Sequence, residues 1–225
     1  MLPGLDGTGK LFAEFVQHLP PSIDPVIISY PRDQPLGYDE LEALVLAALP
    51  HDRPFVLLGE SFSGPIAMRI GARSPAGLVA VILCGTFAKN PFPWLGWARP
   101  LVARLPLKSL PRWVRAPLMW GSASPRRAPA QSERAMAGVS PAVIRHRIAA
   151  LLAVDESAAL RAIRLPTLVL RGRRDRVISW AATRWIVRTL SAARLVEIDG
   201  PHLLLQTCPA ECAAAVLEFM RGRPS

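Results

Sequence analysis

The sequence predicts an α/β fold with one mostly parallel sheet and helices on both faces of that sheet. Short apolar stretches alternate with amphipathic stretches along much of the chain, which is the rhythm of repeated strand–helix–strand units. The apolar stretches are almost continuously hydrophobic, as strands are when both faces of a sheet are covered. The length of 225 residues fits one such domain.

The first part of the chain alternates helical and strand patterns. Amphipathic stretches at 10–19, 38–49 and 62–73 are each followed within two residues by a proline, which predicts that a helix ends there. The run Val-Ile-Ile-Ser-Tyr at 26–30 and the run Phe-Val-Leu-Leu at 55–58 have the β-branched and aromatic residues that favour strands. We therefore expect three helices and two strands here.

The same alternation continues later in the chain. The apolar runs 78–84, 168–170 and 195–198 predict three more buried strands. Amphipathic patterns at 180–190 and 210–220 predict helices, and the second of these begins directly after a proline. Each predicted helix can return the chain to the start of the next parallel strand, as this fold class requires.

The segment 87–155 breaks the alternation. It is rich in Pro, Trp and Arg, and it has only short helical patterns such as 143–152. We expect residues 1–86 and 156–225 to form the core, with 87–155 inserted as a lid. Four tryptophans lie in this segment: Trp94, Trp97, Trp113 and Trp120. Their rings either line an apolar acyl pocket or pack the lid onto the core, and the sequence leaves both open.

Composition limits the classes of partner. No apolar run approaches the roughly 18 residues of a membrane span, and no leader pattern opens the chain, so a cytoplasmic protein is expected. The formal charge is +10, and residues 99–147 hold ten basic residues against one acidic residue. An acidic carrier protein is one candidate partner for this stretch. The basic residues form no nucleic-acid reader motif, so no nucleic acid is expected.

Three cysteines, Cys84, Cys208 and Cys212, are an odd number at spacings that fit neither a disulfide framework nor paired metal knuckles. Cys208 and Cys212 are spaced to share a helix face, but no histidine lies near them in sequence to complete a zinc site. We expect reduced thiols and no metal.

The run Gly-Glu-Ser-Phe-Ser-Gly at 59–64 follows a predicted strand and opens a predicted helix. In that setting a G-x-S-x-G-like sequence indicates a nucleophile elbow, with Ser61 as the nucleophile. Small residues two positions away let the strand and the helix approach closely; Gly59 meets this demand, whereas Ser63 stands where the motif has glycine. Gly64 is expected to relieve part of the crowding.

A serine hydroxyl needs a base, and the base needs a partner that fixes its tautomer. Of the four histidines, His18, His51, His146 and His202, only His202 follows a predicted strand at the edge where α/β proteins gather their chemistry. Asp175 follows the preceding strand and is the predicted acid, in the order Ser, Asp, His. Asp199 lies too close to His202 in sequence, and Asp155 is placed to cap a helix.

The glycine-rich run Leu-Pro-Gly-Leu-Asp-Gly-Thr-Gly at 2–9 fits an oxyanion loop. Its donor would be the Leu5 N–H, and the second donor would be the Phe62 N–H, next to the nucleophile. Residues 4–10 also read G-x-x-x-x-G-K, but Leu11 follows where a phosphate-binding loop needs Ser or Thr to hold Mg²⁺. Nucleotide binding is therefore disfavoured.

Together, LPGLDGTG, GESFSG, RGRRDRV and DGPHLLLQ make the chain resemble the α/β-hydrolase superfamily over its whole length. It is most similar to small bacterial esterases of the branch that includes pimeloyl-carrier-protein methyl ester esterase. The resemblance implies an α/β-hydrolase fold, a triad of Ser61, Asp175 and His202, an acyl-enzyme mechanism, no metal and no cofactor. It also implies a helical lid after the sixth strand of the fold, where 87–155 lies.

One departure from that family concerns the N-terminus. In the family an apolar strand runs into the oxyanion loop, between the strand that is 26–30 here and the strand that ends at Gly59, but only Met1 and Leu2 precede Pro3. Unpaired inner edges of a sheet are costly. We therefore expect the natural product to start upstream, and we expect a loose loop and weak activity if it starts at Met1.

The function expected from these residues is hydrolysis of a small acyl ester, or a thioester, by an acyl-enzyme route. Two alternatives stay open. The same triad supports acyl transfer to an alcohol, and a weakly active or silent homologue could bind an acidic partner through the basic lid.

Overall fold

The computed structural model of the chain describes residues 1–94 and 128–222. Its sheet has, within those residues, four strands in the order β1-β2-β3-β4, and every neighbouring pair is parallel. The strands are β1 (Phe55–Glu60), β2 (Leu78–Cys84), β3 (Thr167–Gly172) and β4 (Ala193–Ile198). The α/β class with a mostly parallel sheet, predicted from the sequence, is confirmed.

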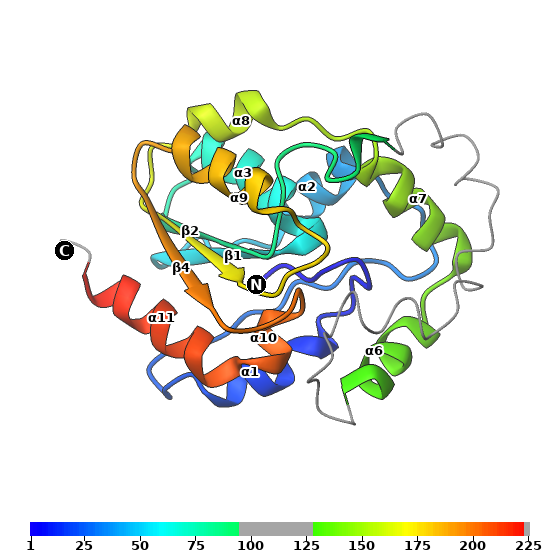
Figure 1. Cartoon of the computed structure of the whole chain (residues 1–225), viewed down its shortest axis with the longest axis horizontal. Helices are drawn as coiled ribbons and strands as arrows, with labels where there is room; N and C mark the ends of the chain where they lie inside the picture. The colour runs from blue at the N-terminus through cyan, green and yellow to red at the C-terminus, as the bar shows by residue number, and fades with distance from the viewer. Residues whose placement is uncertain (95–127, 223–225) are drawn as a thin grey trace.

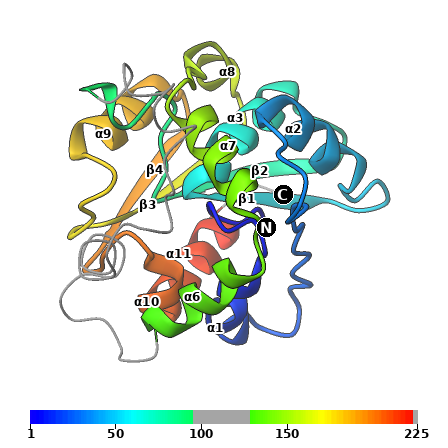
Figure 2. The same cartoon turned by 90° about the vertical axis from the view of Figure 1, so that its right-hand side faces the viewer.

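Helices cover both faces of the sheet (Figures 1 and 2). One face carries α2 (Tyr38–Ala47), α3 (Gly64–Arg73), α8 (Ser157–Ala162) and α9 (Trp180–Thr189). The other carries α1 (Ala13–Gln17), α10 (Leu204–Thr207) and α11 (Pro209–Arg221). Short 3₁₀ turns, η1 (Lys10–Phe12) and η2 (Ser61–Ser63), precede α1 and α3. No helix in the described residues has the length and apolarity to cross a membrane.

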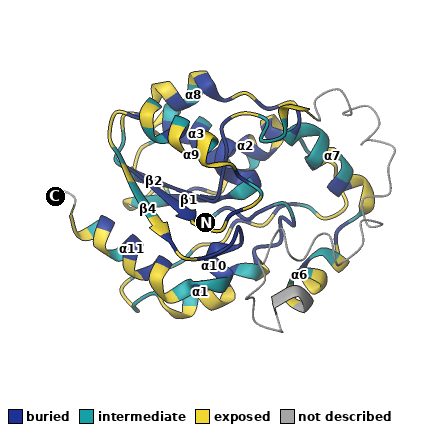
Figure 3. Ribbon diagram, in the orientation of Figure 1, coloured by how far each residue is buried: buried dark blue, intermediate teal, exposed yellow. Residues whose placement is uncertain are grey.

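Alternate side chains of the strands point into two separate cores, because successive residues of a strand face opposite sides. Leu57, Val81 and Val169 pack with residues of α2, α3 and α9, whereas Leu58, Ile82 and Leu170 pack with residues of α1 and α11. The strands β1 and β2 are buried along most of their length, and the outward faces of the helices are exposed (Figure 3). This double coverage explains the continuous hydrophobicity of these strands in the sequence.

Residues 26–30 do not form a strand, which corrects the sequence prediction. Their neighbour in space is Met1-Leu2, which lies between them and β1: Ile28 N–H donates to Met1 O at 3.1 Å, and Leu2 N–H donates to Leu58 O at 2.7 Å. Only Leu2 forms a bridge, with Gly59, before the chain turns into the glycine-rich loop. Met1 and Leu2 are too few residues to form a continuous strand ladder with residues 26–30 on one side or with β1 on the other. An apolar cleft of about 360 Å³ lies beside Met1, at the end of β1 away from Ser61.

The segment 87–155 leaves the core and returns to it at one place. Lys89 and Asp155 form an antiparallel bridge, and Glu156 N–H donates to Ala88 O at 2.7 Å. Between these points lie α6 (Ala128–Ala137) and α7 (Pro141–Leu151), where Ser140 caps α7 by accepting the Ala142 N–H at 3.2 Å. The juxtaposed ends let the segment project from the core without interrupting it, which is compatible with the predicted insertion.

Candidate active site

Three loops at the carboxyl ends of β1, β3 and β4 bring the predicted site residues together. Ser61 directly follows β1, Asp175 lies just beyond β3, and His202 lies just beyond β4. In parallel sheets these ends meet at one edge, which is where α/β proteins bind ligands. The convergence therefore follows from strand order, because each side chain sits within a few residues of a strand end.

Ser61 has the backbone geometry of a tight strand-to-helix turn. Its φ of 47° is in the left-handed region, which is uncommon for a residue other than glycine and costs conformational energy. Gly59 is required beneath it, since a Cβ there would lie 2.7 Å from Ala67 Cβ and 2.8 Å from Ser63 O. Gly64 is packed more tightly still, against Thr86, whose hydroxyl donates to Ser61 O at 2.6 Å.

A chain of two hydrogen bonds connects the three side chains. The distance from Ser61 Oγ to His202 Nε2 is 3.0 Å, and that from His202 Nδ1 to Asp175 Oδ2 is 2.9 Å. When Nδ1–H donates to the carboxylate, Nε2 carries a lone pair that accepts the Ser61 hydroxyl proton. The His202 side chain is 1% exposed, and Ser61 is only partly buried. The geometry therefore places a base next to a hydroxyl that solvent or substrate can reach.

Asp175 is fixed in place by its own loop. Its Oδ1 accepts the Val177 N–H at 2.8 Å and the Ile178 N–H at 2.9 Å, which leaves Oδ2 directed at the imidazole. Burial alone would raise the pKa of this carboxyl, but the hydrogen bonds from His202, Ile178 and Val177 stabilise the carboxylate and hold its pKa below the ordinary value. Asp175 is therefore ionised at neutral pH.

The other candidates for the acid role are engaged elsewhere. Asp155 accepts the Ser157 N–H at 3.0 Å, at the start of α8. Asp199 pairs with Arg174 at 2.9 Å on the surface.

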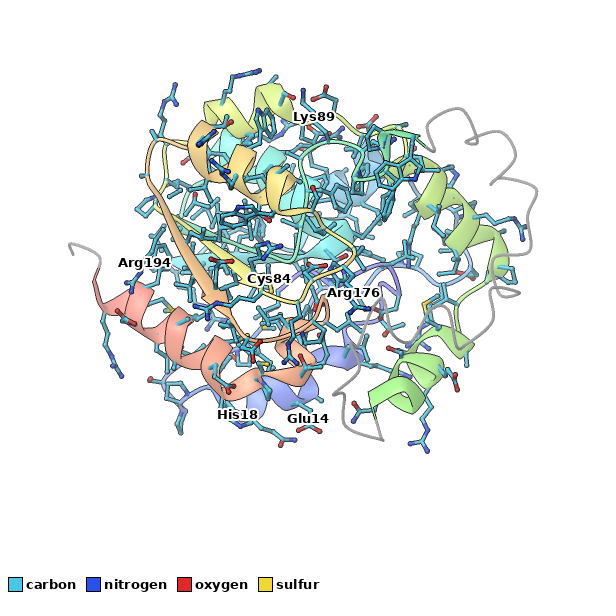
Figure 4. The ribbon with its side chains drawn as sticks, viewed as in Figure 1. Glu14, His18, Cys84, Lys89, Arg176 and Arg194 are labelled. Carbon is cyan, nitrogen blue, oxygen red and sulfur yellow. The ribbon has the colours of Figure 1, made fainter. Side chains whose placement is uncertain are left out.

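His18 and Cys84 occupy different parts of the fold. His18 bonds to its own helix through Glu14 O, and both side chains lie at the outer face of α1, whereas Cys84 lies inside the fold (Figure 4). The three cysteines are free thiols.

The loop at 3–9 lies beside Ser61 and has the form expected of an oxyanion loop. The Gly7 N–H donates to Gly4 O at 3.0 Å and closes a four-residue turn, with Gly7 at a φ of 69°. The amide of the second residue of such a turn, Leu5, is not used in closing it. Gly4 lies close to both Ser61 and Glu60, since a Cβ on it would be 3.9 Å from Ser61 Cβ. The loop thus places Gly4, the residue before Leu5, next to Ser61, and the Leu5 N–H stays the predicted oxyanion donor.

Ser63 has a role that the sequence did not reveal. Its fully buried hydroxyl donates to Pro3 O, and the Tyr30 hydroxyl donates to Ser63 Oγ at 2.6 Å. Burial raises the pKa of Tyr30, which keeps that donor protonated. The serine that replaces the motif glycine therefore ties the elbow to the glycine-rich loop. A tyrosine that ends the apolar run at 26–30 was the only sequence signal.

Glu60 is a second unpredicted feature: it is the last residue of β1, directly before the nucleophile, and it is 3% exposed. It accepts the Gln206 amide at 2.8 Å and the Gly4 N–H. Burial raises its pKa to about 7. Nearby Asp6 also raises this pKa, whereas the hydrogen bonds from Gln206 and Gly4 and the nearby His202 lower it. A glutamate beside a buried strand and a glutamine inside the apolar run LLLQ were the available signals.

This shift predicts a pH-dependent effect of Glu60→Gln on stability. Between the ordinary pKa of 4.5 and about 7, the unfolded chain releases a proton that the folded protein retains, so the unfolding free energy of the natural protein falls as pH rises through this window. The Gln variant has no such loss. From pH 4.5 to 8 we expect the variant to gain about 3 kcal/mol relative to the natural protein, from 1.36 kcal/mol per pKa unit.

Urea unfolding of both proteins at pH 5, 6, 7 and 8 measures this difference. Glu14→Gln, which neutralises an exposed glutamate on α1, is the control and should show no comparable trend. A difference between Glu60→Gln and the natural protein that is constant with pH would contradict the raised pKa.

The predicted acyl pocket lies mostly outside the described residues. Trp97, Trp113 and Trp120 fall in 95–127, as does most of the basic stretch. Trp94 is 65% exposed, with its ring 5.7 Å from that of Phe92. The pocket role of these tryptophans stays a prediction.

Comparisons with known proteins agree with this architecture. A parallel sheet with Ser, Asp and His at its carboxyl edge, in that chain order, defines the class of α/β hydrolases. The model of the alpha/beta hydrolase family matches residues 1–215, and the chain belongs to this family.

Two kinds of relative were found. A putative carbamate hydrolase RutD from Rhizobium rhizogenes is 29% identical over 98% of this chain and 91% of its own length. Among solved structures, the enol-lactonase of Burkholderia xenovorans LB400 has a TM-score of 0.82 at 20% identity, over 97% of this chain and 88% of its own. MenH from S. aureus has a TM-score of 0.81 at 16% identity, over 98% of this chain and 91% of its own. These structural likenesses show the fold.

Proposed function

We propose that this chain is a serine hydrolase that cleaves carboxylic esters through an acyl-enzyme intermediate. The observation that carries the proposal is the hydrogen-bonded chain from Ser61 Oγ to His202 Nε2, at 3.0 Å, and from His202 Nδ1 to Asp175 Oδ2, at 2.9 Å. The strained turn at Ser61 and the glycine-rich loop beside it support the same chemistry.

In the first half-reaction His202 Nε2 removes the Ser61 proton as Oγ attacks the ester carbonyl carbon. The carbonyl oxygen becomes an oxyanion that accepts hydrogen bonds from the Leu5 and Phe62 N–H groups. The imidazolium is stabilised by ionised Asp175, whose lowered pKa suits that role. When the carbon–oxygen bond to the leaving group breaks, Nε2–H gives its proton to the departing alkoxide, and the acyl group remains on Ser61.

In the second half-reaction water takes the place of the alcohol. His202 removes a proton from the water, and the water oxygen attacks the acyl carbon. When the second oxyanion collapses, His202 returns the proton to Ser61 Oγ and the acid is released. No step needs a metal or a cofactor.

The bond that is cleaved has a carbonyl attached to a heteroatom. Relatives named as a carbamate hydrolase and an enol-lactonase share this feature. A small acyl ester is the substrate class we propose, and an acidic acyl carrier protein is a candidate docking partner for the basic stretch at 99–147. The same residues support thioester cleavage and acyl transfer to an alcohol. Product analysis with p-nitrophenyl esters of graded length, with and without added alcohols, distinguishes hydrolysis from acyl transfer.

Covalent labelling tests the proposal. A fluorophosphonate probe should add one equivalent to the natural protein, and peptide mass spectrometry should place it on Ser61. Ser22→Ala, which removes an exposed hydroxyl, is the matched control and should label at the same rate. Absence of labelling would favour a silent homologue, and labelling at another serine would overturn the assignment of Ser61 as the nucleophile.

A further inference from the structure

Arg147 is the largest fully buried side chain of the described residues, and the proposed reaction steps do not use it. It projects from α7, in the 87–155 segment, and is 1% exposed. Figure 2 shows α7 next to the N-terminal segment that carries the glycine-rich loop. A buried guanidinium is expensive to desolvate, so the contacts that hold it there identify what it does.

All of the hydrogen bonds described for Arg147 go to backbone carbonyls rather than to a carboxylate. Nη1 donates to Leu5 O at 3.0 Å and to Asp6 O at 2.9 Å, and Nη2 donates to Pro31 O at 2.9 Å. The guanidinium also lies over the Tyr30 ring, 5.6 Å from its centroid. Its Nε is buried and has no hydrogen-bond partner among the described residues. The described hydrogen bonds of the Arg147 side chain therefore hold the glycine-rich loop and the backbone of Pro31 beside it.

The loop is shaped to receive this side chain. Gly7 has a φ of 69°, and a Cβ there would lie 2.4 Å from Arg147 Nη1 and 2.8 Å from Cζ, so a larger residue would displace the guanidinium. Leu5 and Asp6 are the two central residues of the turn closed by Gly7 N–H and Gly4 O. Their two carbonyls are held by one planar nitrogen, which fixes the rotation of the turn. The Leu5 N–H belongs to the same turn.

We propose that Arg147 is a positioning residue that holds the Leu5 N–H in the orientation that an oxyanion requires, through its hydrogen bonds to the Leu5 and Asp6 carbonyls. This inference rests on the proposed function. It makes the oxyanion loop depend on a side chain from the lid segment, so the donor is in place only when α7 is docked on the core.

Lysine cannot replace arginine in this role. An ammonium is a single point donor, whereas the planar guanidinium reaches three carbonyls in two chain segments at once. A carboxylate would be a stronger partner for the buried guanidinium than a backbone carbonyl. Because the described acceptors of Arg147 are backbone carbonyls, its hydrogen bonds act on the geometry of the loop.

Kinetics of Arg147→Met and Arg147→Lys test the proposal. With a p-nitrophenyl ester, Arg147→Met should lower kcat about 10- to 100-fold, which is less than the roughly 10²–10³-fold cost of losing an oxyanion donor outright, while KM changes less than about twofold. Arg147→Lys should fall in between. Arg145→Met is the matched control, since it removes a half-buried arginine of the same helix, and it should behave as the natural protein does.

A trifluoromethyl ketone of the same acyl length separates positioning from folding. It forms a tetrahedral adduct with Ser61 whose oxyanion needs the loop, so its Ki should rise by the same factor as kcat/KM falls. Unchanged kcat and Ki in folded Arg147→Met, or an effect confined to KM, overturns the proposal. If neither Arg147 variant folds, or if Arg147→Lys has natural kcat and Ki, the residue serves stability alone. Failure of the natural protein to label or turn over esters would instead refute the proposed function itself.

Discussion

Replacing Ser61 with alanine is expected to lower kcat for a p-nitrophenyl ester by about 10⁴- to 10⁶-fold. The change removes the attacking oxygen and leaves the elbow, the glycine-rich loop and the His202–Asp175 pair in place. Residual activity would come from binding and oxyanion stabilisation alone. Alanine also retains a Cβ at a φ of 47°, so it neither adds nor relieves backbone strain relative to serine.

Steady-state kinetics at pH 7.5 with Ser22→Ala as control measure this loss. The control removes a hydroxyl from the surface and should keep kcat within about twofold, since surface changes away from a site have small effects. A Ser61→Ala protein that retains more than a tenth of the natural kcat would show that another group performs the attack.

Asp175→Asn is expected to lower kcat by about 10⁴-fold while leaving the fold intact. The asparagine carbonyl can occupy the place of Oδ1 and still accept the Val177 and Ile178 N–H groups, so the loop keeps its bonds. The amide nitrogen then replaces Oδ2 and faces His202 Nδ1 as a donor. It favours the tautomer with the proton on Nε2, which cannot accept the proton of Ser61.

Asp199→Asn is the control for this substitution. Asp199 pairs with Arg174 at the surface near the same sheet edge, and surface ion pairs contribute little to stability. Its kcat should match that of the natural protein, and both variants should unfold at nearly the natural urea concentration. A fall in kcat of less than tenfold in Asp175→Asn would remove Asp175 from the proposed mechanism.

The sequence predicted most of the central sheet because its signals are local. The strands at 55–58 and 78–84 and the turn at 59–64 are identified by short apolar runs bounded by glycine or proline, and the structure has β1, β2 and the elbow at those places. Residues 26–30 have an equally strong pattern but form no strand, since a strand also requires a neighbour of sufficient length, and Met1-Leu2 provides one bridge. The short helix α10 was missed because four residues carry too little periodicity.

The residues of the candidate site also fall into those that the sequence predicted and those that it did not. Ser61, Asp175 and His202 could be named from the sequence because each directly follows a predicted strand, and parallel strands end at one edge. Glu60, Ser63 and Arg147 could not, because what they do depends on partners far away in the chain: Gly4 and Gln206, Pro3 and Tyr30, Leu5 and Asp6.

The sequence by itself determined the fold class, the family and the three residues placed at the strand ends, since these follow from hydrophobic pattern and chain order. Only the tertiary structure decided how the glycine-rich loop is held, because its anchors are hydrogen bonds from Arg147 of α7, from Ser63 after β1 and from the Tyr30 N–H, which donates to Gly7 O at 2.7 Å. Such bonds depend on the distance between atoms in the folded chain, and the spacing of letters along the sequence does not encode that distance.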